Sequence, residues 1–153
     1  MKIRDIMTPD PRTCTPETTL AAAAGLMWDT DCGILPVLEN GALVGVVTDR
    51  DICIALATRN ARAAAMKVGE VAGRTVWTCG PDEDPRAALA VMGQHQVRRL
   101  PVVDVGGTLV GMISMNDLVL AAGPGGPVRN DQIVGTLKGI CSHHLPAPKV
   151  DVA

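Results

Sequence analysis

Gly45-Val46-Val47-Thr48-Asp49-Arg50-Asp51 is the stretch that decides the fold, because it recurs as Gly111-Met112-Ile113-Ser114-Met115-Asn116-Asp117. In each copy an apolar strand pattern with a glycine, which allows close backbone approach, runs into a Thr or Ser that can start a helix. The Asp three residues after that hydroxyl matches a capping box, which needs no ligand. A helix N-terminus can equally hold a phosphate. Duplication of the whole frame favours the ligand interpretation.

The repeat extends well beyond this segment. A shift of 65 residues superposes Thr13-Cys14-Thr15-Pro16 on Thr78-Cys79-Gly80-Pro81, and Leu35-Pro36-Val37 on Leu100-Pro101-Val102. One inserted residue at Gly106-Gly107 then keeps the rest in register. The chain is therefore a duplicated module. We expect repeat 1 over residues 1–62, repeat 2 over residues 63–122, and a C-terminal extension over residues 123–153.

Each repeat predicts the same order of elements. A short extended stretch precedes a helix, whose apolar face in repeat 1 is formed by Leu20, Ala23, Ala24, Met27 and Trp28. In repeat 2, Asp84 is the expected N-cap, with Pro85 at the first helical position. Two strands joined by a Gly-containing turn follow, at 34–38 and 43–47 and at 100–104 and 109–113. A second helix completes a β-α-β-β-α repeat in an α+β fold.

The C-terminal extension begins with the breaker-rich segment 123–127. Asn130 is then expected to cap a short helix with one apolar face, formed by Ile133, Val134, Leu137, Ile140 and Cys141. That face can pack on its own domain or form a dimer contact, and both interpretations stay open. The residues that follow show no periodicity and are expected to fray.

Composition excludes several classes of protein. Hydrophobic residues make up 47% of the 153, yet there is no Phe or Tyr, and the net charge is −2. A nucleic-acid-binding protein would need a basic surplus and rings for stacking bases. We see no signal peptide, membrane span or catalytic motif, and therefore expect a cytoplasmic protein that is not an enzyme. The 5 cysteines include no Cys-x-x-Cys pair, so buried, inert thiols are favoured over a disulfide or metal site.

The sequence also resembles a known family. The leading Asp5-Ile6-Met7-Thr8-Pro9, the Leu-Pro-Val strands and the two Gly-x-x-(Thr/Ser)-x-x-Asp segments resemble tandem CBS (cystathionine-β-synthase) domains, or a Bateman module, over about residues 3–122. The segment 133–142 is similar to the C-terminus of small stand-alone bacterial CBS-pair proteins of the hypoxia-response type. The resemblance implies two repeats packed sheet to sheet about a pseudo-two-fold axis. It also implies two clefts for AMP, ADP, ATP or S-adenosylmethionine, no required cofactor, and a homodimer.

The resemblance assigns roles to individual residues. Asp51 and Asp117 would hold ribose, while Thr48 and Ser114 would contact phosphate. Arg98-Arg99 is expected to face the phosphate in the Asp117 cleft, with a solvated strand end as the alternative. The Asp51 cleft is then short of positive charge unless Arg50, Arg12 or Lys67 reaches into it. The adenine would lie between aliphatic walls. Weaker candidates are Thr13, Thr78 and Leu100, and Trp77 either lies near a cleft or fills core or interface.

We therefore expect a regulatory protein whose clefts bind an adenosine-type ligand. Its target would be a separate effector protein, with no nucleic acid and no membrane among its partners. The alternative is a nucleotide-free dimeric stress-response scaffold, tuned by thiol chemistry or a metal through Cys141.

Overall fold

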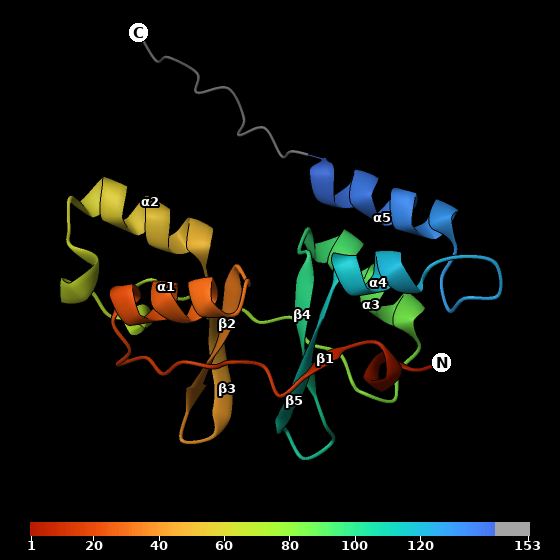
Figure 1. Cartoon of the computed structure of the whole chain (residues 1–153), viewed down its shortest axis with the longest axis horizontal. Coiled ribbons are helices and arrows are strands. Elements are labelled where there is room, and N and C mark those ends of the chain that lie inside the picture. Colours follow the sequence, from red (N-terminus) through yellow and green to blue (C-terminus); the bar gives the residue numbers. More distant parts are fainter. Residues whose placement is uncertain (143–153) are drawn as a thin grey trace, which may run out of the picture.

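The computed structural model describes residues 1–142, which form two α+β repeats lying side by side, with the two sheets adjacent at the centre (Figure 1). Repeat 1 contains α1 (Leu20–Asp29), β2 (Ile34–Glu39), β3 (Ala42–Thr48) and α2 (Asp49–Arg59). Repeat 2 contains α3 (Pro85–His95), β4 (Arg99–Val103), β5 (Leu109–Ser114) and α4 (Met115–Ala121). The strands β2 and β3 pair antiparallel, as do β4 and β5. The predicted α+β duplication is confirmed.

Turn and cap residues explain where these elements begin and end. The β2–β3 turn places Asn40 and Gly41 at φ values of 51° and 79°, a conformation that Gly adopts readily and Asn tolerates. Thr19 caps α1 by accepting a hydrogen bond from the Ala22 amide. Asp84 caps α3 in the same way, with Pro85 at the first turn, as predicted.

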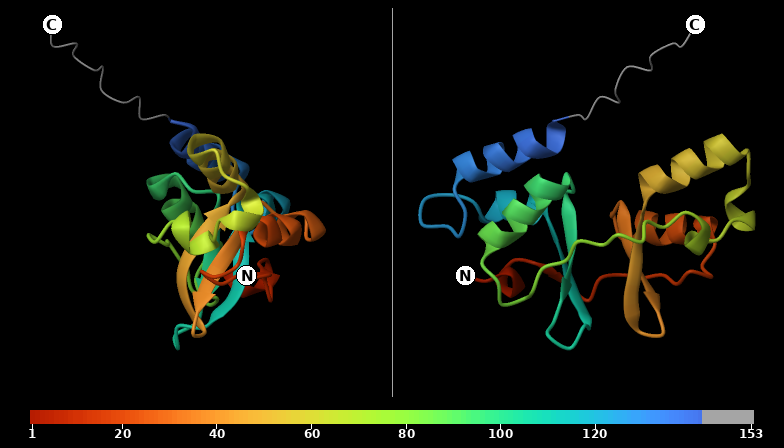
Figure 2. Two further views of the ribbon diagram at one scale, coloured as in Figure 1. Left: turned by 90° about the vertical axis from the view of Figure 1, so that its left-hand side faces the viewer. Right: turned by 180° about the vertical axis from the view of Figure 1, so that it is seen from behind.

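The segment that precedes each repeat in the sequence joins the other repeat in space. The short helix η1 (Ile3–Asp5) and the strand β1 (Thr8–Pro9) come before repeat 1, yet β1 pairs with β5 of repeat 2. Likewise η2 (Ala63–Ala65) and η3 (Val68–Glu70) come before repeat 2, and Gly73 bridges to β3 of repeat 1. Figure 2 shows both segments running across the junction between the repeats.

The two exchanged segments make equivalent contacts. The Ile3 amide donates to the Glu83 carbonyl at 3.0 Å, and the Val68 amide donates to the Thr18 carbonyl at 2.8 Å. Ile3 is fully buried in the core of repeat 2, and Val68 in the core of repeat 1. These matched exchanges follow the same 65-residue shift, as a pseudo-two-fold relation requires.

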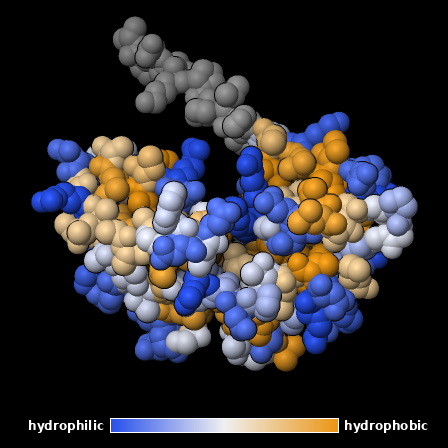
Figure 3. Space-filling view, viewed as in Figure 1, coloured by the Kyte–Doolittle hydropathy of each residue, from blue (hydrophilic) through white to orange (hydrophobic). Residues whose placement is uncertain are grey.

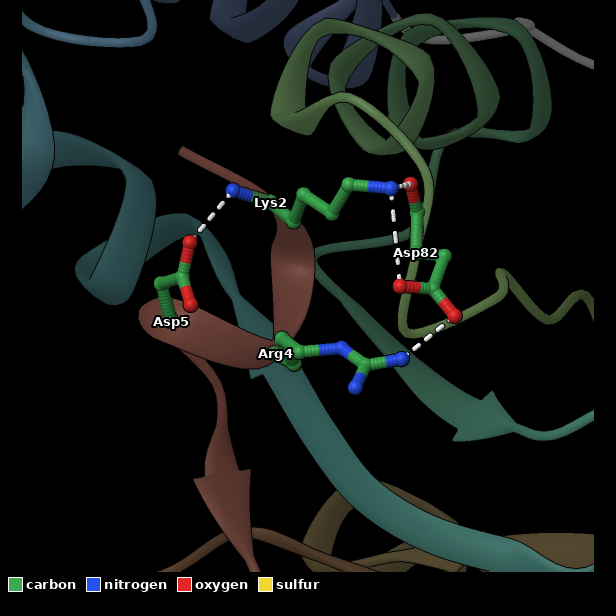
Figure 4. A network of polar contacts seen from close by, with 4 residues as sticks. All are labelled: Lys2, Arg4, Asp5 and Asp82. Atoms are coloured by element: carbon green, nitrogen blue, oxygen red, sulfur yellow. Dashed lines mark hydrogen bonds and ion pairs between the residues drawn. The ribbon is translucent and has the colours of Figure 1, made fainter.

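Ion pairs accompany the N-terminal exchange. Figure 4 shows the side chains of Lys2 and Arg4 reaching Asp82, while the Lys2 backbone amide donates to Asp5 at 2.7 Å. All of these groups are exposed, and exposed pairs contribute roughly 0–1 kcal/mol because water screens them. The ion pairs therefore add little to the attachment that the buried Ile3 side chain, the backbone hydrogen bonds and the β1–β5 pairing provide.

One predicted face is partly wrong. In α1 only Leu20, Ala23 and Met27 are buried, whereas Trp28 is 85% exposed and Ala24 is exposed. The buried stripe follows positions i, i+3 and i+7, and the residues one step further around the helix face outward. Trp28 therefore lies on the surface of repeat 1.

The C-terminal helix α5 (Asn130–Cys141) packs against α3 of repeat 2. A Cβ at Gly139 would lie 3.3 Å from the Gly93 carbonyl oxygen, so the two backbones approach closely where both helices have glycine. Ile133 is buried there, which confirms packing on the chain's own domain. The N-cap is residue 129 instead of Asn130.

Two residues assigned to the buried face of α5 are placed differently. Val134 is 51% exposed and Cys141 is exposed, so packing on the chain's own domain is wrong for these two residues, and a dimer contact stays a prediction for them. The apolar stripe on α3 contacts only the side of α5 that carries Ile133, Leu137 and Ile140. The tail predicted to fray, from residue 143, lies outside the described residues.

Candidate functional site

Both duplicated segments form complete capping boxes. The Thr48 hydroxyl accepts a hydrogen bond from the Asp51 amide at 3.1 Å, and the Thr48 amide donates to Asp51 Oδ2 at 2.9 Å. In repeat 2 the Ser114 amide and hydroxyl both donate to Asp117 Oδ2, at 2.7 and 2.6 Å. Hydrogen bonds from residues 1–142 reach only Oδ2 of each carboxylate. The capping interpretation is therefore correct, and it still leaves Oδ1 of each Asp for a ligand.

The glycines of these segments leave room for the backbone of another segment of the chain to lie against the strand. A Cβ at Gly45 would lie 2.8 Å from the Gly73 carbonyl oxygen, and one at Gly111 would lie 3.0 Å from the Thr8 carbonyl oxygen. Thr8 and Gly73 belong to the two exchanged segments, so each glycine lets the segment from the other repeat cross its strand.

Two cavities lie between the repeats at equivalent positions. The Ser114 cleft, about 420 Å³ in volume, is lined by Asp10, Arg12, Asp31, Arg99, Ser114 and Asp117, among others. The Thr48 cleft, about 510 Å³, is lined by Thr48, Arg50, Trp77, Gln96, Arg98 and Arg99, among others. Each cleft combines one helix start with an exchanged segment and the strand start of the opposite repeat. Figure 3 shows one face of the molecule hollowed between its halves, with hydrophilic residues around the hollow.

The arginine pair lies mainly on the cleft opposite to the one expected. Arg98 lines the Thr48 cleft, and Arg99 lines both clefts, whereas the sequence pattern had paired them with Asp117. The reason is topological: the start of β4 faces the helix start of repeat 1 across the junction. The Thr48 cleft is therefore not short of positive charge, because Arg98 and Arg99 line it and Arg50, one of the three residues named as an exception, lines it too.

The two clefts differ in charge. The Thr48 cleft has three arginines, Arg50, Arg98 and Arg99, against the single carboxylate of Asp49. The ion pairs that the described residues form include none of these arginines. The Ser114 cleft has three carboxylates and two arginines, the carboxylates being those of Asp10, Asp31 and Asp117. An anion is therefore favoured beside Thr48.

The remaining candidates are scattered. Asp117 lines the Ser114 cleft, while Asp51 caps its helix and does not line the Thr48 cleft. The Leu100 side chain is fully buried in the core of repeat 2, so it faces neither cleft. Thr78 lines a separate groove beside Asp82, and Thr13 lines neither of the two clefts.

Trp77 lines the Thr48 cleft with 41% of its surface exposed, so it lies near a cleft and does not fill the core. Its ring stacks on His95 with centroids 3.4 Å apart and planes 11° apart. Nothing in the local sequence pattern pairs His95 with a tryptophan 18 residues earlier. The repeat offers one signal that Trp77 lines a cleft: it corresponds to Arg12 by the 65-residue shift, and Arg12 lines the other cleft.

The cysteines differ in accessibility. Cys14 and Cys79 are buried, and burial raises the pKa of Cys14 to about 11 and that of Cys79 to about 12. Because the thiolate is the reactive form, both are poor nucleophiles and metal ligands at neutral pH. Cys141 is exposed at the end of α5. Within residues 1–142 no three His, Cys, Asp or Glu side chains converge as a metal site would require.

None of the helices described here combines the length and apolar character needed to cross a bilayer. The helices that border the clefts are 7 to 11 residues long.

Comparison with known proteins identifies the family. The CBS domain model matches residues 3–58 and 68–123. CBS domain-containing protein YhcV of Bacillus subtilis is 37% identical over 118 residues, covering 77% of this chain and 83% of YhcV. The structure of Hypoxic Response Protein I with two coordinated zinc ions is 32% identical with a TM-score of 0.71, covering 78% of this chain and 98% of that one.

Two further structures contain adenosine compounds. The CBS domain pair of MJ0100, in complex with 5′-methylthioadenosine and S-adenosyl-L-methionine, is 26% identical with a TM-score of 0.72, covering 78% of this chain and 94% of that one. CBSX2 in complex with AMP is 26% identical with a TM-score of 0.68 and the same coverage. With both repeats matched and the fold shared, this chain belongs to the CBS domain family and carries two copies of the domain.

Proposed function

We propose that this chain is a regulatory CBS pair that binds adenosine-type ligands, AMP, ADP, ATP or S-adenosylmethionine, in the Thr48 and Ser114 clefts. The observation that carries the proposal is the pair of equivalent cavities, each lined by both repeats and each bordered by the same Thr/Ser capping frame. The similar CBS pairs in complex with AMP and with S-adenosylmethionine support it.

Charge distributes the ligands between the clefts. Arg98 and Arg99 hold phosphate in the Thr48 cleft, with the Thr48 hydroxyl beside them. The Ser114 cleft, with its excess of carboxylates, takes an adenosine compound that lacks phosphate. There Asp117, which lines the cleft, accepts the ribose hydroxyls through Oδ1.

Regulation follows from the position of the clefts. A ligand that contacts both repeats stabilises the arrangement in which those contacts are best, and so shifts the population between arrangements. A separate effector protein recognises the arrangement of the two repeats that the ligand favours. A homodimer is supported by exposed apolar residues such as Trp28 on α1 and Leu120 on α4, which are 85% and 86% exposed. Apolar residues also gather over the helices of repeat 2 on the face shown in Figure 3.

The test is calorimetric titration and thermal melting with AMP, ATP and S-adenosylmethionine. A ligand present at 100 times its Kd stabilises the folded state by about 2.7 kcal/mol. Arg98→Ala should weaken AMP binding by more than tenfold, because a charge-assisted contact is lost. The matched control is Arg62→Ala, an exposed arginine that lines neither cleft.

Flat melting curves with all three compounds would contradict the proposal. They would favour the alternative, a nucleotide-free dimeric scaffold tuned through Cys141, whose exposed thiol is the observation in its favour. That alternative predicts a melting temperature that changes with zinc or with a chelator, and loses this response in Cys141→Ser.

A further inference from the structure

We infer that Trp77, held in place by His95, is the platform on which the base of a nucleotide stacks in the Thr48 cleft. The inference rests on the proposed function and narrows it: this cleft selects a ligand with both a planar base and a phosphate. It also replaces the expectation that an adenine here lies only between aliphatic walls.

The backbone on both sides of Trp77 is fixed. Before it, Gly73 exchanges two hydrogen bonds with Val46 of β3, with N–O distances of 3.0 and 3.1 Å. After it, the Cys79 amide donates to the Pro101 carbonyl at 3.2 Å. The short span carrying Trp77 is therefore tied to repeat 1 at one end and to repeat 2 at the other. A ring placed in this way needs little ordering when a ligand binds.

His95 covers one face of the indole. It is the last residue of α3, directly before Gln96, which ends the helix in the left-handed conformation at a φ of 55°. The rings stack nearly parallel, so the exposed 41% of Trp77 lies on its other face and its edges. Because Trp77 lines the Thr48 cleft, this free surface is available to a base in that cavity.

The same cavity contains the groups that a phosphate needs. Arg50, Arg98 and Arg99 line it together with Trp77, and none of the three forms an ion pair within residues 1–142. A planar ring and unpaired guanidinium groups in one cavity of about 510 Å³ match the two ends of a nucleoside monophosphate.

The Ser114 cleft provides an internal comparison. There Arg12 occupies the position of Trp77, and Thr30 occupies that of His95, and both line the cleft. The other tryptophan, Trp28, lines a different cavity beside Ala24 and Ile52. The chain has no Phe or Tyr, so Trp77 is the ring that can distinguish the two clefts.

The experiment uses the full chain with Trp28→Phe, which leaves Trp77 as its one tryptophan. AMP, adenosine, ribose 5-phosphate and inorganic phosphate are titrated, and each sample is followed by tryptophan fluorescence and by calorimetry. We expect AMP to change Trp77 emission saturably, with the midpoint found by calorimetry. Ribose 5-phosphate, which lacks the base, should bind at least about tenfold more weakly.

Substitutions separate stacking from folding. Trp77→Leu should weaken AMP binding by about tenfold or more, while Trp77→Phe retains most of the affinity because it keeps a ring. His95→Ala should raise the Kd by a smaller factor and reduce the AMP-dependent change in Trp77 emission, since His95 acts by positioning the ring. Trp28→Leu is the matched control and should leave the Kd unchanged.

Calorimetric binding of AMP with no change in Trp77 emission, and with equal affinity in Trp77→Leu, would overturn the inference and leave the proposed function standing. No binding of any adenosine compound by either method would overturn both. If Trp77→Leu does not fold, the inference is still tested by the AMP-dependent emission of Trp77 in the Trp28→Phe chain and by the AMP affinity of Trp77→Phe.

Discussion

The exchange of N-terminal segments predicts a specific effect of Ile3→Ala. Ile3 is fully buried in the core of repeat 2, although it precedes repeat 1 in the chain. Replacing a buried Ile by Ala costs about 2–5 kcal/mol. At about 2–4 °C per kcal/mol for a chain of this size, the melting temperature should fall by roughly 4–20 °C. The matched variant Val68→Ala removes a smaller side chain from the core of repeat 1 and should cost less.

The two buried thiols report which repeat is affected. Cys79 belongs to the core that contains Ile3, and Cys14 to the core that contains Val68. Labelling with iodoacetamide, followed by mass spectrometry of the peptides, should therefore show faster modification of Cys79 in Ile3→Ala and of Cys14 in Val68→Ala. Selective acceleration of Cys14 in Ile3→Ala, or equal acceleration of both thiols, would refute the assignment of the N-terminal segment to repeat 2.

Three other perturbations have defined outcomes. Gly111→Ala should destabilise by about 1–3 kcal/mol in urea unfolding because its Cβ meets the segment crossing β5, whereas Gly135→Ala on α5, with open space around it, should stabilise by about 0.5–1 kcal/mol; equal effects would argue against the crossing. Asp84→Ala should lower the melting temperature, whereas Asp84→Asn should keep it close to that of the unchanged chain, since Asn also caps helices. An equally low melting temperature for Asp84→Asn would show that the Asp84 cap does not stabilise α3. Burial raises the pKa of Cys14 and Cys79 from 9.0 to about 11 and 12, so the thiols lose their protons at lower pH in the unfolded state than in the folded state. The stability that the two protonated thiols contribute is therefore complete below pH 9 and is lost as the pH rises through 11–12. The urea midpoint should fall over that range more steeply than in Cys14→Ala/Cys79→Ala, and parallel curves would contradict this.

The repeat made the fold predictable. Duplicated strand, turn and cap signals at a constant shift placed both hairpins and both helix starts within one residue of their observed positions, because these elements depend on local sequence. The exchange of segments was not predicted, since pairing of Thr8 with Met112 depends on contacts far apart in the chain.

The site was predicted in its residue types more than in its assembly. Thr48, Ser114, Asp117 and Arg99 do line the two clefts. Arg98 was assigned to the cleft of its own repeat, because the sequence does not show that each cleft is closed by the opposite repeat.

Trp77 shows a further limit of sequence patterns. In a chain rich in hydrophobic residues, composition alone favours the interpretation that a tryptophan is buried. Its stacking on His95 requires the end of α3 and an irregular segment to meet in space, which no periodicity reveals.

The most direct test of the central claim is a crystal structure of the chain grown with saturating AMP. We predict density for the nucleotide in the Thr48 cleft, with its base against Trp77 and its phosphate beside Arg98 and Arg99. Clefts without nucleotide density at saturating AMP, or AMP bound elsewhere on the protein, would contradict the account.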